Sequence, residues 1–322
     1  MSISEIPARL AVRTVDDLVG LVPYLVGFHP VESLVVVVLC QGRVEVTARA
    51  DLAEVADPDG MAYLLGRLFE RFPACEAWVL AYTDDTELAW DVLAAGAALC
   101  GVMRLGRVIH VGNGFWRCDA PDGDTGEVGI SSAAVQAAVL GLPVRRSRAE
   151  LRELVAGPAD GEVEELCDLF ERVATEIAEL GARPCRRLLA RLLRRGGERV
   201  RADWVRLAVL VAEPEATLRL LSTMDAADAD HLVAVWTQVV RHCLMPYLPN
   251  PLGLLGVASW LTGDGAMASI CLERIQGIDP ASPMAGLLAE IITQVLPPSA
   301  WPGARPALVE AVGAWFGVPA RT

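Results

Sequence analysis

The sequence contains no lysine, and all 28 of its basic residues are arginines. A phosphate-binding loop of the Walker type, a pyridoxal enzyme and a protein kinase each depend on a specific lysine amine, which contacts phosphate or forms a Schiff base. The absence of lysine therefore excludes these three classes in their standard forms.

The sequence also lacks the closely spaced ligand pairs of metal sites. Its eight cysteines include no Cys-x-x-Cys pair, and its four histidines include no His-x-x-x-His pair. Structural zinc sites are usually built from such local pairs. We therefore expect no metal ion and no cofactor, and we expect the thiols to be mostly reduced residues of the core.

No apolar run is long enough to cross a membrane. The longest runs, at 31–40, 88–103 and 244–261, are interrupted by acidic residues or prolines, whereas a spanning helix needs about 20 consecutive apolar residues. The first residues include Glu5 and Pro7 and show no basic stretch followed by an apolar core, so no signal peptide is expected. These absences predict a cytoplasmic protein with no membrane partner.

What is present predicts two domains, because 322 residues exceed the usual size of one. In the first part, branched apolar runs and period-two alternation indicate strands at 32–40, 43–49, 77–82, 103–111 and 115–118. Helices are expected between them, with Asp84 and Glu87 as a capping box, and Gly112-Asn113-Gly114 is expected to form a hairpin turn. This alternation favours an α/β domain with a mixed sheet at residues 1–145.

The remainder, residues 146–322, shows only helical spacing and predicts an all-α array. A helix is expected at 131–142, at the end of the first domain, and the helices expected in the second are at 148–155, 163–180, 185–194, 202–211, 229–244, 252–261, 266–275 and 284–295. A tetratricopeptide-like hairpin is expected near 252–280, because small and large residues recur there at the intervals of that repeat: Gly256, Gly263, Ala268, Leu272, Ile275 and Pro280. Any antiparallel helix pair needs small residues at its crossing, which is the simpler explanation of the same pattern.

Several blocks resemble a known family. Residues 22–37 (VPYLVGFHPVESLVVV) and 48–52 (ARADL) are similar to the opening signature of the actinobacterial family catalogued as domain of unknown function 4192. The resemblance continues at 81–85 (AYTDD), 116–118 and 260–268 (WLTGDGAMA). It implies a fold and no activity. Members often have a Cys-Cys-Pro sequence after the position of Cys118, which this chain lacks.

Polar residues beside the first predicted strand form one candidate site. In a hydrolase, Ser33 would be the nucleophile, His29 its base and Asp51 the residue that orients the base. Glu32 and Arg49 would be ligand-binding neighbours. The competing interpretation is that these side chains hold the turn at 27–30 and the hairpin together, because buried polar groups need partners whatever the function.

A second candidate site lies at the end of the strand 77–82. Open α/β sheets bind ligands beyond the carboxyl ends of their strands, where Tyr82, Asp84 and Asp85 are expected. Two adjacent carboxylates could hold a divalent metal ion. Helix capping by Asp84 explains the same residues without a ligand.

The chain is acidic, with a formal net charge of −13, which argues against nucleic-acid binding over its whole surface. Nine arginines are nevertheless gathered within 183–206, at positions 183, 186, 187, 191, 194, 195, 199, 201 and 206. We expect the helix at 185–194 to pair with the acidic helix at 163–180, because opposite charges on neighbouring helices neutralise each other. No nucleic-acid partner is therefore predicted.

These observations lead to two alternative functions. The first is a cytoplasmic protein-interaction or regulatory module that holds a protein partner on its helical domain. The second is an enzyme, either a hydrolase or a metal-dependent phosphotransfer enzyme, with its site at the sheet edge of the first domain. The positions of the candidate polar side chains distinguish the two, because an enzyme needs them to converge on an accessible space.

Overall fold

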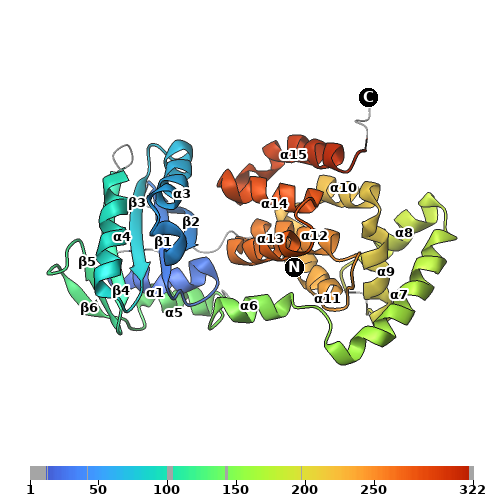
Figure 1. The fold of residues 1–322 in the computed structure, drawn as a ribbon, viewed down its shortest axis with the longest axis horizontal. Coiled ribbons are helices and arrows are strands. Elements are labelled where there is room, and N and C mark those ends of the chain that lie inside the picture. Colours follow the sequence, from blue (N-terminus) through green and yellow to red (C-terminus); the bar gives the residue numbers. More distant parts are fainter. Residues whose placement is uncertain are drawn as a thin grey trace. The chain divides into compact units, whose positions relative to one another are not determined.

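A computed structural model gives the fold, and it describes residues 12, 14–41, 43–99, 104–141, 144–196 and 198–318. The chain divides into two compact units, residues 1–148 and 149–322 (Figure 1). The first contains a mixed sheet with helices and the second is helical, so the predicted fold class is confirmed. Within the described residues, no helix combines the length and apolar composition that crossing a bilayer requires.

The first unit is built on one six-stranded sheet. Its strands are β1 (Ser33–Cys40), β2 (Arg43–Asp51), β3 (Glu76–Tyr82), β4 (Arg104–Gly112), β5 (Phe115–Cys118) and β6 (Thr125–Glu127). They lie in the order β2-β1-β3-β4-β5-β6, and all neighbours are antiparallel except β3 and β4. The parallel pair is joined by a crossover helix, as parallel neighbours require.

Strand β1 lies inside the sheet and is its most buried element. Residues 34–38 are each fully buried, in agreement with the continuous apolar run in the sequence. The predicted turn between β4 and β5 is also present, with φ of 52° at Asn113 and 80° at Gly114. Two successive residues with positive φ are typical of the turn that fits the twist of a two-residue hairpin.

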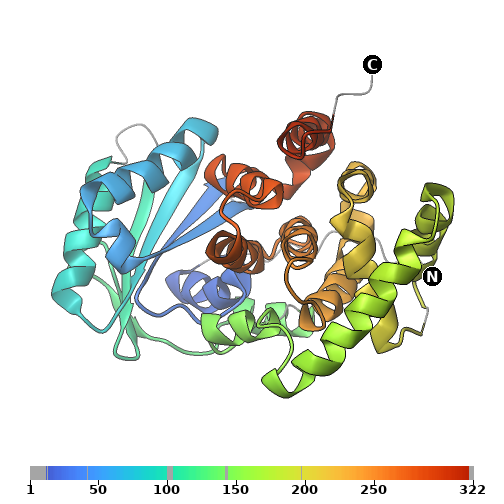
Figure 2. The same ribbon diagram turned by 45° about the vertical axis from the view of Figure 1, so that its right-hand side comes forward.

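Helices cover both faces of the sheet (Figure 2). They are α1 (Val15–Val26), α2 (Leu52–Val55), α3 (Pro58–Arg71), α4 (Thr86–Leu99) and α5 (Ser132–Val139). Helix α4 packs on β3 and β4 and against α3, whereas α1 packs with α5 on the other face. Trp116 of β5 donates its indole N–H to Asp16 of α1 at 2.7 Å, which ties the second helical layer to the sheet.

The cysteines depart from the expectation of reduced core thiols at one place. Cys40 at the end of β1 forms a disulfide with Cys75, which immediately precedes β3. Sequence spacing did not reveal the pair, because 35 residues separate the two and only the β1–β3 register brings them together. Of the other described cysteines, three are free and buried, at positions 118, 243 and 271, while Cys167 is exposed and Cys185 half-buried.

The second unit contains ten helices in its described part: α6 (Arg148–Leu154), α7 (Val163–Ala178), α8 (Ala182–Leu192), α9 (Arg201–Ala212), α10 (Pro214–Thr223), α11 (Ala226–Arg241), α12 (Pro249–Leu261), α13 (Gly265–Ile278), α14 (Pro283–Thr293) and α15 (Trp301–Trp315). Helix α6 begins at the boundary between the two units. Short 3-10 turns occupy Asp160–Glu162 and Pro298–Ala300. Helices α10 and α15 were not predicted from the sequence.

Helix α12 is the centre of this unit, since it packs against α9, α11, α13 and α14 and is buried around its whole circumference. With α13 it forms the helix hairpin predicted near 252–280. The predicted small residue Gly256 lies where a Cβ atom would come within 2.7 Å of a Leu288 methyl group and 3.2 Å of the Cys271 Cβ. Glycine at this position therefore lets both α13 and α14 pack closely against α12.

Candidate functional site

The candidate residues of the first unit meet at one end of the sheet. Ser33 begins β1, and in the strand register it lies directly opposite both Asp51, the last residue of β2, and Tyr82, the last residue of β3. Directly opposed residues of antiparallel strands share one face of a sheet. The fold therefore places these three side chains side by side and joins Tyr82, expected in a separate site, to Ser33 and Asp51.

A hydrogen-bond network occupies the Ser33 hydroxyl completely. The hydroxyl donates to the carbonyl oxygen of Val31 at 2.7 Å, and it accepts from Nε and Nη2 of Arg49 at 2.9 and 2.7 Å. A guanidinium cannot remove the hydroxyl proton, because it is a donor that stays protonated in proteins. Ser33 is also fully buried, so the geometry gives it no activating base and no access to a substrate.

Arg49 and Arg148 hold the Asp51 carboxylate from two sides. Arg49 Nη2 lies 2.5 Å from Oδ1, and Arg148 Nη1 lies 3.4 Å from Oδ2. The guanidinium of Arg49 also stands over the ring of Phe28, 5.7 Å from its centroid. The four polar residues Ser33, Arg49, Asp51 and Arg148 therefore form one network, which we call the strand-end clamp, linking β1 and β2 to Arg148, the last residue of the first unit.

His29 and Glu32 lie apart from this clamp. The His29 side chain is exposed and makes no hydrogen bond to Ser33 or Asp51, while its backbone N–H donates to the carbonyl oxygen of Arg145 at 3.1 Å. Glu32 accepts a hydrogen bond from the Thr83 hydroxyl at 2.7 Å. The serine, histidine and aspartate expected for a hydrolase are therefore not arranged as a catalytic triad.

Asp84 and Asp85 form hydrogen bonds with different parts of the chain. Asp84 Oδ1 accepts from the backbone N–H of Asn113 at 2.6 Å and so fixes the β4–β5 turn. Asp85, not the predicted Asp84, caps α4, since its Oδ1 accepts from the N–H groups of Glu87 and Leu88 at 3.1 and 3.0 Å. Among the described residues, no group of three or more His, Cys, Asp and Glu side chains is arranged to hold a metal ion.

Tyr82 and His110 are the buried titratable groups at this end of the sheet. The Tyr82 hydroxyl is buried without a hydrogen-bond partner in the described part of the chain, and burial raises its pKa far above the ordinary value. His110 Nε2 lies 2.9 Å from the Thr83 carbonyl oxygen, and its ring meets Trp90 of α4 edge to face. His110 is thus a core histidine with its polar atom engaged.

Two residues of these networks, Thr83 and Arg148, were not singled out in the sequence. Thr83 stands between the two candidates Tyr82 and Asp84, so its position at the strand end was a usable signal. Arg148 had none, because 97 residues separate it from Asp51. Only the tertiary structure brings Arg148, the last residue of the first unit, to the end of β2.

The cysteine thiols offer no nucleophile in the buried positions. Burial raises the pKa of the Cys118 thiol to about 11 and that of the Cys243 thiol to about 12. A thiol with such a pKa stays protonated at neutral pH, and the thiolate is the reactive form. These residues therefore serve the core.

We expect the strand-end clamp to stabilise the first unit. Replacing Arg49 by Leu leaves Ser33 without its donors and Asp51 without its closest cation, so the free energy of unfolding should fall by roughly 1–3 kcal/mol. Chemical denaturation followed by circular dichroism measures the change. Arg117→Leu on β5 is the matched control, because Arg117 makes no ion pair within the described structure, and it should shift stability by less than about 0.5 kcal/mol. Equal effects of the two substitutions would contradict the clamp.

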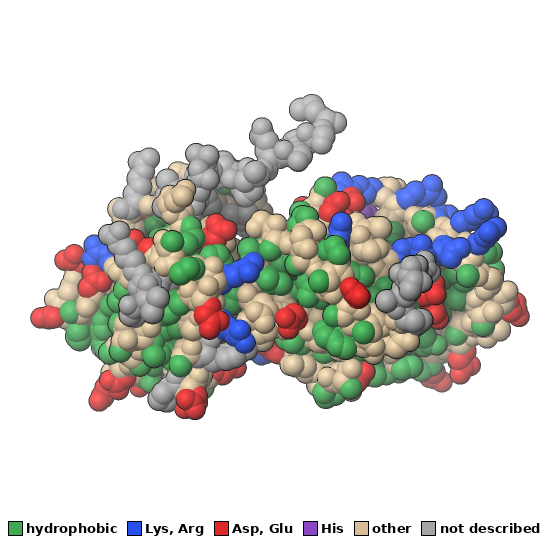
Figure 3. All heavy atoms as spheres, turned by 90° about the horizontal axis from the view of Figure 1, so that it is seen from above, with side chains coloured by type: hydrophobic (Ala, Val, Ile, Leu, Met, Phe, Trp, Pro, Cys, Tyr) green, Lys and Arg blue, Asp and Glu red, His purple; other side chains and the backbone are tan. Residues whose placement is uncertain are grey.

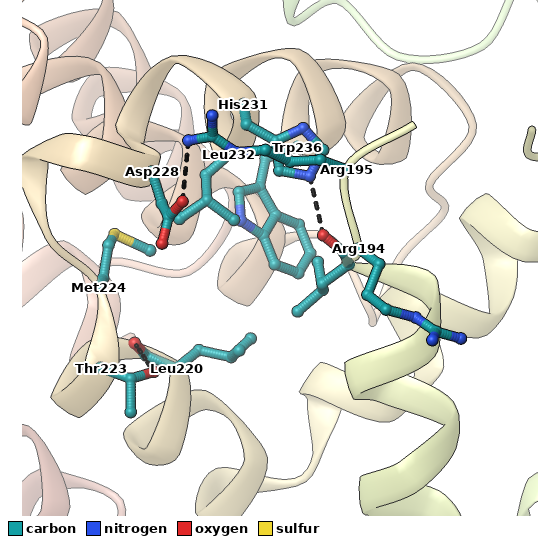
Figure 4. Close-up of a pocket in the computed structure, with 10 residues that line it drawn as sticks. Arg194, Arg195, Leu220, Thr223, Met224, Asp228, His231, Leu232 and Trp236 are labelled. Carbon is teal, nitrogen blue, oxygen red and sulfur yellow. Dashed lines mark hydrogen bonds and ion pairs between the residues drawn. The ribbon is translucent and has the colours of Figure 1, made fainter. Parts of the chain in front are cut away.

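Two hollows in the described part of the helical unit are candidate binding sites. The first, of about 300 Å³, lies between α10, α11 and the segment that follows α8 (Figure 4). Two of the polar groups around it are paired: Arg195 with Asp228 at 2.8 Å, and His231 Nε2 with the carbonyl of Leu193 at 2.8 Å. Trp236 forms part of its wall, and this residue is fully buried.

The second hollow is a groove of about 580 Å³ between the end of α7 and helices α8, α9 and α10, which we call the α8–α10 groove. Its apolar lining comes from Ile177, Leu180, Leu189, Val209, Ala212 and Ala216 among others. Charged side chains of both signs stand along it, Arg186 and Arg219 together with Glu213 and Glu215. An apolar floor with charged margins is the usual composition of a site for an amphipathic ligand.

The arginine-rich segment differs in part from expectation. Arg201 and Arg206 of α9 pair with the acidic helix α7, through Glu162 and Glu165 and through Glu176. The prediction was wrong for the helix expected at 185–194, observed as α8, whose arginines form no ion pair among the described residues. The reason is the packing. Both α7 and α8 pack on α9, so the acidic residues along the side of α7 reach the arginines of α9 and not those of α8.

Comparisons with known proteins agree with the resemblance seen in the sequence. A family model described as a domain of unknown function, DUF4192, matches residues 16–299. Neither the curated proteins nor the solved structures contain a match to this chain. The match includes the strand-end clamp and the α8–α10 groove.

Proposed function

The chain belongs to the DUF4192 family, and since no activity is attached to that family, we propose from its structure that it is a cytoplasmic protein-interaction or regulatory module whose helical unit holds a protein partner. The α8–α10 groove carries this proposal. Its volume lies within the roughly 300–1,000 Å³ of ordinary ligand sites, and it is lined by side chains of four consecutive helices.

The chemistry of the groove favours an amphipathic helix as its occupant. Leu189 is buried in the floor, and the half-buried Ile177, Val209 and Ala216 leave room for apolar anchors spaced three and four residues apart. Charges of both signs at the margin can pair with a mixed polar face. A partner of this kind buries apolar surface in the floor and gains specificity at the margin.

The enzyme alternative has less support. A hydrolase at the sheet edge requires a base beside Ser33, and the Ser33 proton is instead donated to the Val31 carbonyl. A metal-dependent phosphotransfer enzyme requires Asp84 and Asp85 to converge, and they hold the β4–β5 turn and α4 instead. The polar residues of the first unit thus act as caps and ties.

Filling the groove tests the proposal. Ala212 is exposed and lines the groove at the end of α9, so Ala212→Trp should block it without disturbing the core. Ala307→Trp on α15 is the matched control, because Ala307 is exposed, lies outside the groove and is far from both charged helices in sequence. The tagged full chain, expressed at its natural level in its own cells, should retain a stoichiometric partner in the native and Ala307→Trp forms and lose it in Ala212→Trp.

The partner must then bind the purified full chain. Its affinity should fall at least about tenfold for Ala212→Trp, and hydrogen exchange of the α8 and α10 amides should slow on binding. A partner that binds both variants equally, or protection confined to the first unit, would overturn the proposal. Occupation of the groove by a small molecule alone would also overturn it.

A further inference from the structure

Helix α8 presents a face of positive charge that nothing in the described structure neutralises. Arg183, Arg187 and Arg191 follow one another at intervals of four residues, and Arg194 continues the row just after the helix. All four are exposed, and none makes a hydrogen bond or ion pair through its guanidinium with any described residue. Figure 3 shows basic side chains gathered at the α8 end of the helical unit. We call this row the arginine face.

Helix α7 presents an equally uncompensated acidic face. Glu164, Asp168 and Glu171 lie at helical intervals of four and three residues, and Glu179 lies on the same side two turns later. All four are exposed and are outside the ion pairs that α7 makes with Arg201 and Arg206. The buried side chains Leu166, Phe170 and Val173 point the opposite way, into α9, so this acidic face is the outermost surface of the helix.

The two faces have comparable length and opposite sign. The row from Arg183 to Arg194 spans twelve residues, about 16 Å at the rise of a helix, and the part of the acidic face from Asp168 to Glu179 spans the same number. They do not neutralise each other within one chain, because each helix packs on α9 and turns its charged row outward. Each chain therefore carries one acidic and one basic surface, and the basic row matches the Asp168 to Glu179 part of the acidic face in length.

We propose that these two faces join two copies of this chain in a symmetric dimer, with α7 of each copy against α8 of the other. A two-fold axis makes both contacts equivalent, and two-fold dimers are the commonest oligomers. The outer faces of α7 and α8 form this contact, whereas the groove proposed for a partner lies on the inner side of α8, so the two proposals use different surfaces and fail independently.

Screening decides whether two acidic chains can meet in this way. The net charge of −13 repels a second copy over long distances, but the Debye length at physiological salt is about 8 Å. Opposite charges in contact across the interface are closer than one Debye length and still attract each other. The repulsion between the remaining charges of the two chains is largely screened. Exposed ion pairs are individually weak, so the dimer should have a micromolar dissociation constant that rises in about 1 M salt.

Reversing the charges of each face by substitution tests the proposal, and sedimentation velocity of the full chain measures dimerisation. Reversal of the basic face (Arg183→Glu, Arg187→Glu, Arg191→Glu) places acid against acid in both contacts, and reversal of the acidic face (Asp168→Arg, Glu171→Arg, Glu179→Arg) places base against base. Each variant alone should dimerise at least about tenfold more weakly than the native chain. An equimolar mixture of the two should form a heterodimer, because every reversed row then meets a row of opposite sign.

The matched control changes the same amount of charge elsewhere. Arg71→Glu, Arg117→Glu and Arg241→Glu lie outside both faces, and this triple variant should dimerise like the native chain. A native chain that stays monomeric into the hundred-micromolar range, or a mixture that gives no heterodimer, would overturn the proposal. Salt-sensitive binding of a labelled single-stranded or duplex oligonucleotide to the arginine face of a monomeric chain would overturn it in favour of a nucleic-acid partner.

Discussion

Replacing Val36 by Asp is expected to leave the first unit unfolded and the protein insoluble. Val36 lies in the middle of β1, is fully buried, and is paired with Ala48 of β2 and Val79 of β3. A carboxylate placed there has no cation or donor beside it, and burying an unpaired charge costs several kcal/mol or more. Since single domains are stable by only about 5–15 kcal/mol, this one change removes most of the stability.

The same substitution at the surface is the control for this prediction. Val31 precedes β1 and is 69 % exposed, so Val31→Asp introduces the same side chain without burying it. It should be as soluble as the native chain and should melt within a few degrees of it. The fraction of soluble protein after expression and the near-ultraviolet circular dichroism report both variants. A soluble, cooperatively melting Val36→Asp would mean that β1 is not the buried strand of this sheet.

Replacing Gly253 by Ala is expected to destabilise the helical unit. A Cβ atom at Gly253 would come within 2.5 Å of the Cβ of Met284, a fully buried residue on α14, so α12 and α14 would have to separate. Overpacking of this kind costs about 1–3 kcal/mol, more than the gain of up to about 1 kcal/mol from replacing glycine by alanine in a helix. Thermal unfolding monitored by tryptophan fluorescence should show a lower midpoint, because Trp236 and Trp260 lie in this unit.

An identical change on the neighbouring helix should act in the opposite direction. Gly277 lies near the end of α13, and a Cβ atom there would meet no atom within 4 Å. Gly277→Ala should therefore raise the free energy of unfolding by a few tenths to about 1 kcal/mol, through helix propensity alone. If both alanines stabilised the unit, the close packing of α12 on α14 would be refuted.

The elements of the fold were largely predictable because their signals are local. The apolar run of β1, the Asn113-Gly114 turn and the helical spacing of α7 each depend on residues a few positions apart. The misses have local causes too. Helix α15 contains Pro302, Gly303 and Pro306, which the pattern treats as helix breakers, although Pro302 stands in the first turn where proline is accepted. Helix α10 follows α9 with only Glu213 between them, and Pro214 concealed its start.

Part of the candidate site was predictable, since the sequence placed Ser33, Arg49 and Asp51 at one sheet edge and left open that they hold the hairpin together. The register of β2, β1 and β3 places Ser33 between Asp51 and Tyr82, whereas the sequence had kept Tyr82 in a separate candidate site. The sequence could not show that the Ser33 proton goes to Val31 and that Arg49 fills the remaining lone pairs. Hydrogen bonding depends on side-chain rotamers and on distances of a few tenths of an ångström, which no spacing of residues encodes.

By itself, the sequence determined the fold class, the family, and the absence of lysine chemistry and of local metal motifs, since each follows from composition or from neighbours along the chain. Only the tertiary structure decided which distant groups meet. It joined Cys40 to Cys75 and Arg148 to Asp51, and it turned the charged faces of α7 and α8 outward by packing both helices on α9. The physical reason is that the spacing of residues along a helix or strand determines which side chains are buried. Which other helix or strand they contact depends on the packing of the whole unit.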